Sequence, residues 1–307
     1  MHSLDIVFMG SPDFAIPSLE EIHTSDHAIR AVVSNPDKRR RRRSTPEPTA
    51  VKKRALELGL KTIDVQDVKS DKFHQAIKEL KPDLLVVVAF RILPVSVLEI
   101  PKIGSVNLHA SLLPKYRGAA PIHWSIIKGE KETGCSVFFL NEKVDTGEII
   151  AQSRTKIGEN ETTGDLYNRL KKEGSDLLVK AINQIAEGSV QTKKQDHSLA
   201  TPAPKLFKEN TRIDFTRPAS EVHNFIRGLS PFPVAWCMYG RKKMNIYLSE
   251  QAEEMKLKPG ELHFDGERLL VGCGSNAIEL KSVQLPGTRK MSGRDFANGY
   301  DLNIPLE

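Results

Sequence analysis

The chain has 307 residues, 39% of them hydrophobic, and a formal net charge of +6. This length suits two domains, and the hydrophobic content is enough for buried cores, which excludes wholesale disorder. No stretch approaches the ~20 apolar residues that span a bilayer, and residues 1–5 lack the pattern of a signal peptide. The three cysteines are far apart, without the spacing of a disulfide framework or a zinc site. We therefore expect a reduced, cytoplasmic protein without membrane contact.

The positive charge is concentrated in one segment. Residues 36–54 contain nine basic residues and two acidic ones, so the rest of the chain is close to neutral. A cationic loop in an otherwise neutral protein indicates a polyanionic partner, although a run of like charges is also typical of a solvated segment. The loop contains Lys38, Arg39, Arg40, Arg41, Arg42 and Arg43.

The N-terminal part alternates apolar strands with helices. Strands are expected at 4–9, 28–33, 83–90, 106–109 and 135–140. Helices are expected at 13–22, from Thr49 onward, at 119–127, and from Thr162 to Gly188. This alternation predicts a Rossmann-like α/β domain, an open parallel sheet covered by helices, over residues 1–188. The first turn carries only Gly10, not the three-glycine fingerprint, which disfavours a nicotinamide or flavin cofactor.

The composition changes after residue 188. Residues 189–208 are polar and aperiodic, which is typical of a linker. Residues 209–307 contain five short apolar runs, and Asp265-Gly266 is a strong hairpin signal. Five short strands predict a small β-barrel of the OB type, which would suit contact with nucleic acid; a generic barrel or sandwich is the alternative. The expected strands are 235–239, 244–248, 261–264, 268–271 and 278–283.

A polar cluster at the end of one predicted strand is the candidate chemical centre. Asn107 and His109 are two residues apart, so their side chains share one face of a strand. Asp145 lies in the turn after the next strand, and ligands collect at the carboxyl ends of parallel strands, where we expect these groups. Such a triplet suits acyl transfer to an amine. Asn107 and His109 can donate to a carbonyl oxygen that becomes negative, while Asp145 orients the imidazole or removes a proton.

Each of these residues also has a purely structural interpretation. A lone strand histidine is more often packed than catalytic, and Asp145 before Thr146-Gly147 fits an Asx-type turn equally well. No nucleophile stands out, because Cys135 lies inside an apolar run and no serine elbow or metal-ligand spacing of histidines is present. Direct attack of an amine on a bound acyl donor needs neither a nucleophile nor a metal.

The motifs resemble those of a known family. Residues 107–114 (Asn-Leu-His-Ala-Ser-Leu-Leu-Pro), followed by 116–122 (Tyr-Arg-Gly-Ala-Ala-Pro-Ile), look like the signature of the folate-dependent formyltransferases. Residues 10–14, 144–147 and 212–215 fit the same family, and the resemblance covers essentially the whole chain. The extended form of the signature is most similar to the branch whose acceptor is initiator methionyl-tRNA.

The resemblance implies transfer of a formyl group from 10-formyltetrahydrofolate to the methionine amine of initiator methionyl-tRNA, in translation initiation. We expect a monomer and a reaction without a metal, while self-association stays open. It assigns catalysis to Asn107, His109 and Asp145. It assigns tRNA contact to the loop at 36–48 and to the C-terminal barrel. Folate contact falls on Ser111, Leu112, Leu113 and Pro114.

The chain departs from the family pattern in two places. Unbroken arginines replace the glycines that many members carry in the basic loop, so the charge is kept while individual contacts differ. Phe90-Arg91-Ile92 stands where many members have a tyrosine and a glycine, which changes the wall of the folate pocket.

Two other functions stay open from the residues alone. A formyltransferase acting on a small amine, such as glycinamide ribonucleotide or an amino sugar nucleotide, would use the same triplet. It explains neither the cationic loop nor the barrel. A non-catalytic RNA-binding protein explains the loop and barrel, but has no use for Asn107, His109 and Asp145 together.

Overall fold

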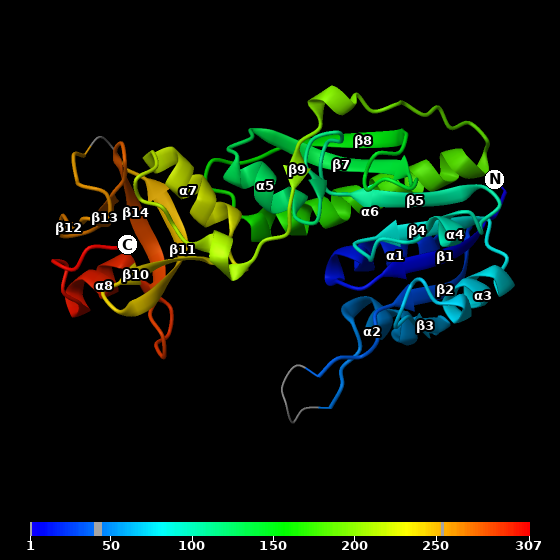
Figure 1. Ribbon diagram of the computed structural model, residues 1–307, viewed down its shortest axis with the longest axis horizontal. Coiled ribbons are helices and arrows are strands. Elements are labelled where there is room, and N and C mark those ends of the chain that lie inside the picture. Colours follow the sequence, from blue (N-terminus) through cyan, green and yellow to red (C-terminus); the bar gives the residue numbers. More distant parts are fainter. Residues whose placement is uncertain (1, 40–44, 253–254) are drawn as a thin grey trace. The chain divides into compact units, whose positions relative to one another are not determined.

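The computed structural model describes residues 2–39, 45–252 and 255–307 (Figure 1). The chain divides into two compact units that interleave along the sequence. Among the described residues, no helix has both the length and the apolar character needed to cross a membrane. Unit 1 contains Met1–Gly118, Gly134–Thr155 and Tyr167–Pro202. Unit 2 contains Ala119–Thr133, Lys156–Leu166 and Ala203–Glu307.

Unit 1 is built on a seven-stranded sheet with the order β3-β2-β1-β4-β5-β7-β8. The first five strands in this order (β3, β2, β1, β4 and β5) pair in parallel, which confirms the predicted α/β sheet. The next strand, β7, pairs antiparallel with β5, so the sheet is parallel-dominated rather than wholly parallel. The strands are β1 (Asp5–Gly10), β2 (Ala28–Ser34), β3 (Thr62–Asp64), β4 (Leu84–Val88), β5 (Gly104–His109), β7 (Glu132–Phe139) and β8 (Ile149–Lys156). Two short strands, β6 (Arg117–Gly118) and β9 (Pro202–Ala203), follow in the loops.

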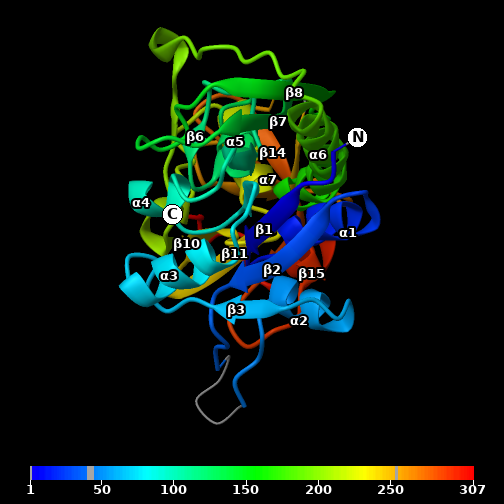
Figure 2. The same cartoon turned by 90° about the vertical axis from the view of Figure 1, so that its right-hand side faces the viewer.

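Helices cover both faces of this sheet. Figure 2 shows α3 and α4 on one side and α1, α2 and α6 on the other. Thr49 accepts a hydrogen bond from the backbone N–H of Lys52, which confirms it as the N-cap of α2. The helices are α1 (Ile16–Thr24), α2 (Ala50–Glu57), α3 (Asp71–Glu79), α4 (Val95–Leu98) and α6 (Thr163–Ala186).

The registers decide which face of the sheet carries the polar cluster. Val87 belongs to the buried core that packs against α3 and α4, and it pairs with Asn107 in the adjacent parallel strand. Paired residues point to the same side of a sheet, so Asn107 and His109 lie on the α3/α4 face. Leu108 points the other way and contacts α6, where a Cβ on Gly174 would lie 3.0 Å from Leu108 Cδ2.

Unit 2 contains a six-stranded antiparallel sheet with the order β10-β11-β14-β13-β12, and β15 pairs with β14. The five predicted strands are confirmed, and the Asp265-Gly266 turn joins β12 to β13. Closure of this sheet into an OB-type barrel remains a prediction. The strands are β10 (Ala235–Tyr239), β11 (Lys242–Gln251), β12 (Leu262–Phe264), β13 (Leu269–Gly272), β14 (Ala277–Gln284) and β15 (Met291–Ser292). The helices are α5 (Pro121–Ile127), α7 (Ala219–Gly228) and α8 (Gly293–Gly299).

Candidate functional site

His109 ends β5 and is nearly buried, with 6% of its surface exposed. Its Nε2 lies 2.8 Å from the carbonyl oxygen of Tyr116. A carbonyl only accepts hydrogen bonds, so Nε2 carries the proton of this contact. The backbone of the following loop therefore fixes the ring, and Nδ1 is the nitrogen left for chemistry.

Asp145 supplies the carboxylate beside this ring. Its Oδ2 lies 3.8 Å from His109 Nδ1, which is longer than a hydrogen bond, and it accepts one from the backbone N–H of Gly118 at 2.8 Å. Asp145 has a φ of +54° and is 8% exposed. Aspartate is one of the few side-chain-bearing residues found in this left-handed region, so the surrounding contacts must hold the conformation.

Asp145 reaches His109 by a different route from the one expected. Because β7 is antiparallel to β5, its last residue, Phe139, pairs with Val106 and not with the carboxyl end of β5. The loop between β7 and β8 therefore has to return toward His109. Gly147 permits this return, since a Cβ there would lie 1.7 Å from the Phe139 carbonyl oxygen. The expectation that Asp145 follows a parallel strand was wrong, although it does lie beside His109.

Asn107 completes the cluster on the same strand face. Its side chain makes no hydrogen bond within the part of the chain that the structure describes, and it is only partly buried. Both amide N–H groups can therefore donate to a ligand. A donor without an internal partner beside a fixed imidazole and a carboxylate is suited to stabilising negative charge on an oxygen.

The four predicted folate contacts divide into two pairs. Ser111 is fully buried and donates its hydroxyl to the Lys115 carbonyl at 2.7 Å. Leu113 is also buried, while Leu112 and Pro114 are partly exposed. Ser111 and Leu113 therefore hold the turn together, and Leu112 and Pro114 are the members that a ligand can reach.

The unusual Phe90-Arg91-Ile92 segment has a defined position after β4. Arg91 donates from Nε to Asn35 Oδ1 at 2.6 Å and from Nη1 to the Gln66 carbonyl at 2.8 Å. These contacts tie the segment to the chain beyond β2 and β3. Ile92 is 73% exposed and presents an apolar surface at this edge of the sheet.

Two residues for which no role was predicted belong to the same cluster, although Arg117 lies within the family signature. Gln195 is 8% exposed and donates from Nε2 to the carbonyl oxygens of Asp145 and Gly147. Arg117 donates from Nε and Nη2 to Gln195 Oε1. Burial lowers the pKa of Arg117, and the nearby charge of Asp145 opposes this shift. No sequence pattern marks Gln195, because it stands in a polar, aperiodic segment.

Cys135 does not provide a nucleophile. It is fully buried in β7, and burial raises its pKa to about 12. A thiol with such a pKa is not ionised near neutrality, and the thiolate is the reactive form. Its burial agrees with its position inside an apolar run of the sequence.

The basic loop is closed at its base by a short bridge. Lys38 and Glu47 exchange two backbone hydrogen bonds of 3.0 Å. Lys38 and Arg39 are exposed, whereas the predicted contacts Arg40–Arg43 lie outside the described residues. Asp37 is paired with Lys52 at 2.6 Å, so a lysine of α2 compensates the charge of this acid.

Unit 2 carries a second cationic surface on the outer side of its sheet, here called the basic–aromatic face. Arg212 and Lys243 lie 5.7 and 4.9 Å from the centre of the Trp236 ring. Lys290 Nζ lies 3.6 Å from the centre of the Tyr247 ring. Burial, and secondly the charge of Lys208, lowers the pKa of Lys243. The face consists of Arg212, Trp236, Lys243, Tyr247 and Lys290.

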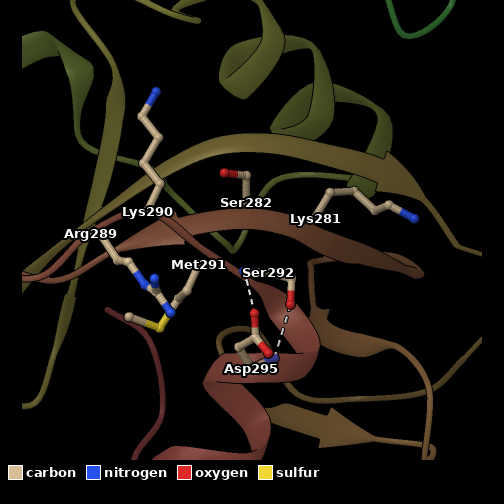
Figure 3. Close-up of a pocket in the computed structure, with 7 residues that line it drawn as sticks. All are labelled: Lys281, Ser282, Arg289, Lys290, Met291, Ser292 and Asp295. Carbon is tan, nitrogen blue, oxygen red and sulfur yellow. Dashed lines mark hydrogen bonds between the residues drawn. The ribbon is translucent and has the colours of Figure 1, made fainter.

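A pocket of about 630 Å³ adjoins this face (Figure 3). Neither Arg289 nor Lys290 pairs with a carboxylate among the residues that the structure describes. Asp295 is turned toward Ser292, whose hydroxyl accepts a hydrogen bond from the Asp295 backbone N–H at 3.0 Å. The lining residues are Lys281, Ser282, Arg289, Lys290, Met291, Ser292 and Asp295.

Comparison with known proteins defines the class. The formyl transferase family model matches residues 4–182, and the model of the formyl transferase C-terminal domain matches residues 205–301. The chain belongs to the formyl transferase family. Among curated relatives it is 45% identical to a methionyl-tRNA formyltransferase of Chlorobium luteolum, over 96% of each chain. It is 39% identical to that of Caldanaerobacter subterraneus, over 98% of this chain and 97% of the relative. Within the family it is therefore a formyl-transferring enzyme of the methionyl-tRNA formyltransferase group.

Solved structures share the fold at lower identity. An N-formyltransferase from Helicobacter canadensis, in complex with folinic acid and dTDP-3-aminofucose, aligns with a TM-score of 0.70 and 24% identity. That alignment covers 90% of this chain and 98% of the other. HypX from Aquifex aeolicus, in complex with tetrahydrofolic acid, aligns with a TM-score of 0.65 and 18% identity, over 96% and 47% of the two chains. These structures show the fold alone.

Proposed function

We propose that the chain transfers a formyl group from 10-formyltetrahydrofolate to the methionine amine of initiator methionyl-tRNA. The observation that carries this proposal is the cluster at the end of β5. There Nδ1 of His109 and the carboxylate of Asp145 lie 3.8 Å apart. Asn107, whose amide has no partner among the described residues, precedes His109 by two residues on the same strand face. These groups match the demands of an amine attacking a formyl carbon, which needs donors for the oxygen and an acceptor for the amine proton.

The roles follow from the hydrogen bonds that are already made. His109 Nε2–H is held by the Tyr116 carbonyl, so the imidazole can donate to the formyl oxygen only through Nδ1. That donation requires a proton on both ring nitrogens. Asn107 provides the second donor. At 3.8 Å, Asp145 Oδ2 makes no hydrogen bond to Nδ1 of the ring, which supports its assignment as the acceptor of the proton that the amine loses.

The formyl group passes directly from the folate to the amine, and no covalent intermediate with the enzyme forms. The amine nitrogen bonds to the formyl carbon and releases a proton toward Asp145. The bond from that carbon to the folate nitrogen breaks, and the leaving nitrogen takes up a proton. We assign the apolar surface against the folate to Leu112 and Pro114, whose partial exposure supports that role, while Ser111 and Leu113 keep the turn in place.

The acceptor is assigned to tRNA because of two cationic surfaces. Lys38 and Arg39 lead into the arginine run, and the only carboxylate immediately before it, Asp37, is paired with Lys52. The basic–aromatic face offers cations above aromatic rings, a combination suited to phosphates and bases. A small amino sugar or ribonucleotide would need neither surface, although sugar formyltransferases share the fold.

The test is a formylation assay with purified chain, 10-formyltetrahydrofolate and charged initiator tRNA. Formation of formylmethionyl-tRNA, with free amino sugar nucleotides and glycinamide ribonucleotide as poor acceptors, is the expected result. Efficient formylation of a small amine with no product on the tRNA would refute the assignment of the acceptor. Binding of tRNA without any formyl transfer would favour the non-catalytic alternative.

A further inference from the structure

We propose that Gln195 is a positioning residue that holds the carboxylate of Asp145 beside His109. This inference rests on the proposed function, because it assigns to Gln195 a role in the same reaction. Gln195 itself makes no contact with Asn107 or His109 among the described hydrogen bonds, so it acts through the Asp145 loop.

Both ends of the Gln195 amide are engaged. Nε2 donates to the Asp145 carbonyl at 3.1 Å and to the Gly147 carbonyl at 2.8 Å. Oε1 accepts from Arg117 Nε at 3.2 Å and from Nη2 at 2.5 Å. All four contacts are made by a side chain that is 8% exposed. A buried amide with every group satisfied is a rigid connection, and its loss leaves several polar groups without partners.

The two loops that Gln195 joins are the two that define the site. The loop after β5 contributes the Tyr116 carbonyl that fixes His109 and the Gly118 N–H that binds Asp145 Oδ2. The loop after β7 contributes Asp145 itself. Gln195 connects Arg117 of the first loop to the backbone of the second, so together they form a closed ring of hydrogen bonds around the carboxylate.

The backbone of Asp145 needs such support. Its φ of +54° is uncommon for a residue with a side chain, and its loop returns from the far end of an antiparallel strand. Without the two donated hydrogen bonds, the carboxylate keeps its contact with the Gly118 N–H, but its backbone is less restrained and it can shift from its place 3.8 Å from Nδ1. A misplacement of about 1 Å in a catalytic group can cost roughly 10²-fold in rate.

A segment a few residues beyond Gln195 also anchors the loop after β5. Thr201 Oγ1 accepts from the Tyr116 N–H at 2.9 Å, and the Thr201 carbonyl accepts from the Arg117 N–H at 2.9 Å. The polar segment that contains Gln195 and Thr201 is thus attached to the site at two points. Gln195 is the one of the two that reaches the Asp145 loop.

The experiment compares Gln195→Met with Gln191→Met. Methionine keeps the length and volume of glutamine but removes its hydrogen bonds, and Gln191 is an exposed glutamine four residues earlier in the same segment. With initiator methionyl-tRNA and 10-formyltetrahydrofolate, Gln195→Met should lower kcat by roughly 10- to 100-fold, with KM for both substrates within about twofold. Gln191→Met should equal the unchanged chain.

Two further measurements separate positioning from a general structural effect. In the background of Asp145→Asn, adding Gln195→Met should cause little further loss, because Gln195 acts through Asp145. Gln195→Glu keeps the acceptor for Arg117 but loses both donors, so it should not restore kcat. Amide hydrogen exchange of residues 141–148 should be faster in Gln195→Met and unchanged in Gln191→Met.

The role of Gln195 and the proposed function would be refuted by different results. If the unchanged chain is active and Gln195→Met has the kcat of Gln191→Met, the role of Gln195 is refuted and the proposed function stands. Independent, multiplicative losses in the double variant, or full activity of Gln195→Glu, would also refute it. If the unchanged chain transfers no formyl group to the tRNA, the proposed function fails, and the catalytic role of Gln195 with it.

Discussion

The polar groups in the site of unit 1 are mostly held by hydrogen bonds, whereas the cations on the basic–aromatic face of unit 2 are less restrained. Around Asp145 nearly every group is engaged: Tyr116 O holds His109, Gly118 N–H holds the carboxylate, and Gln195 holds the backbone. On the basic–aromatic face, Lys243 and Lys290 lie over aromatic rings and have no carboxylate partner among the described residues.

This difference fits the two proposed roles, formyl transfer in unit 1 and tRNA binding on unit 2. A reaction at one carbon atom needs donors and acceptors fixed to within a fraction of an ångström, so their orientation must be set before the substrate arrives. Binding of a polyanion depends on the sum of many weak attractions and tolerates movement of each. Single substitutions should therefore have large effects on turnover in the first region and small effects on affinity in the second.

The largest expected effect comes from His109→Ala. Loss of the ring removes the Nδ1 donor to the formyl oxygen. A doubly protonated ring donates a stronger hydrogen bond than a neutral amide, so its loss should lie at the upper end of the ~10²–10³-fold that one oxyanion donor contributes. We expect kcat for formylation to fall by that range while the affinity for tRNA is unchanged. His263→Ala, at an exposed histidine in β12, is the matched control. Near-normal turnover of His109→Ala would remove the catalytic role of this residue.

Asn107→Ala should come next. The amide has no partner within the described residues, so its removal leaves no buried group unsatisfied, and stability should change little. Loss of one donor to an oxyanion costs ~10²–10³-fold in kcat. Steady-state kinetics should show this fall with little change in KM for the tRNA. A rise in KM alone would instead indicate a binding role for Asn107.

The shared strand face of Asn107 and His109 could be predicted from the sequence because their relation is local. Asn107 and His109 share a face by the period-two geometry of any strand, whatever the fold around them. The parallel strands and α6 were also predictable, since their apolar patterns are continuous. The pairing direction of β7 was not, because it depends on the connection through the rest of the chain. For the same reason, the route by which Asp145 returns to His109 could not be predicted.

Buried polar residues account for two features that were not predicted, the helix α7 and the role of Gln195. The apolar positions of α7 recur at helical spacing, but the same buried side of the helix carries His223 and Arg227, which interrupts the pattern. The role of Gln195 was not predicted for a different reason. Its partners are backbone carbonyls and an arginine from distant segments, and such contacts leave no periodicity in the sequence.

Replacing Arg39–Arg43 with serine tests whether the charge of the basic loop contributes to tRNA binding. Each phosphate contact contributes to the salt dependence of binding, so the change should raise KM for tRNA by roughly 10- to 100-fold and flatten the dependence of affinity on salt. Turnover at saturating tRNA should persist. The control replaces the exposed lysines 69, 72 and 78 with serine. Unaltered kinetics of the arginine variant would favour a small-molecule acceptor.

The smallest expected effect is that of Trp236→Ala on the basic–aromatic face. The ring positions Arg212 and Lys243 and offers a surface for a base, and such stacking is worth about 1 kcal/mol at the low end, or roughly fivefold in Kd. Fluorescence titration with initiator tRNA should show this weakening while kcat is kept. Phe232→Ala is the matched control, because Phe232 is an aromatic residue of unit 2 that is 77% exposed and has no cation over its ring among the described contacts. Equal affinities of the two variants would place the tRNA elsewhere on unit 2, whereas loss of turnover in Trp236→Ala would contradict the separation of binding from chemistry.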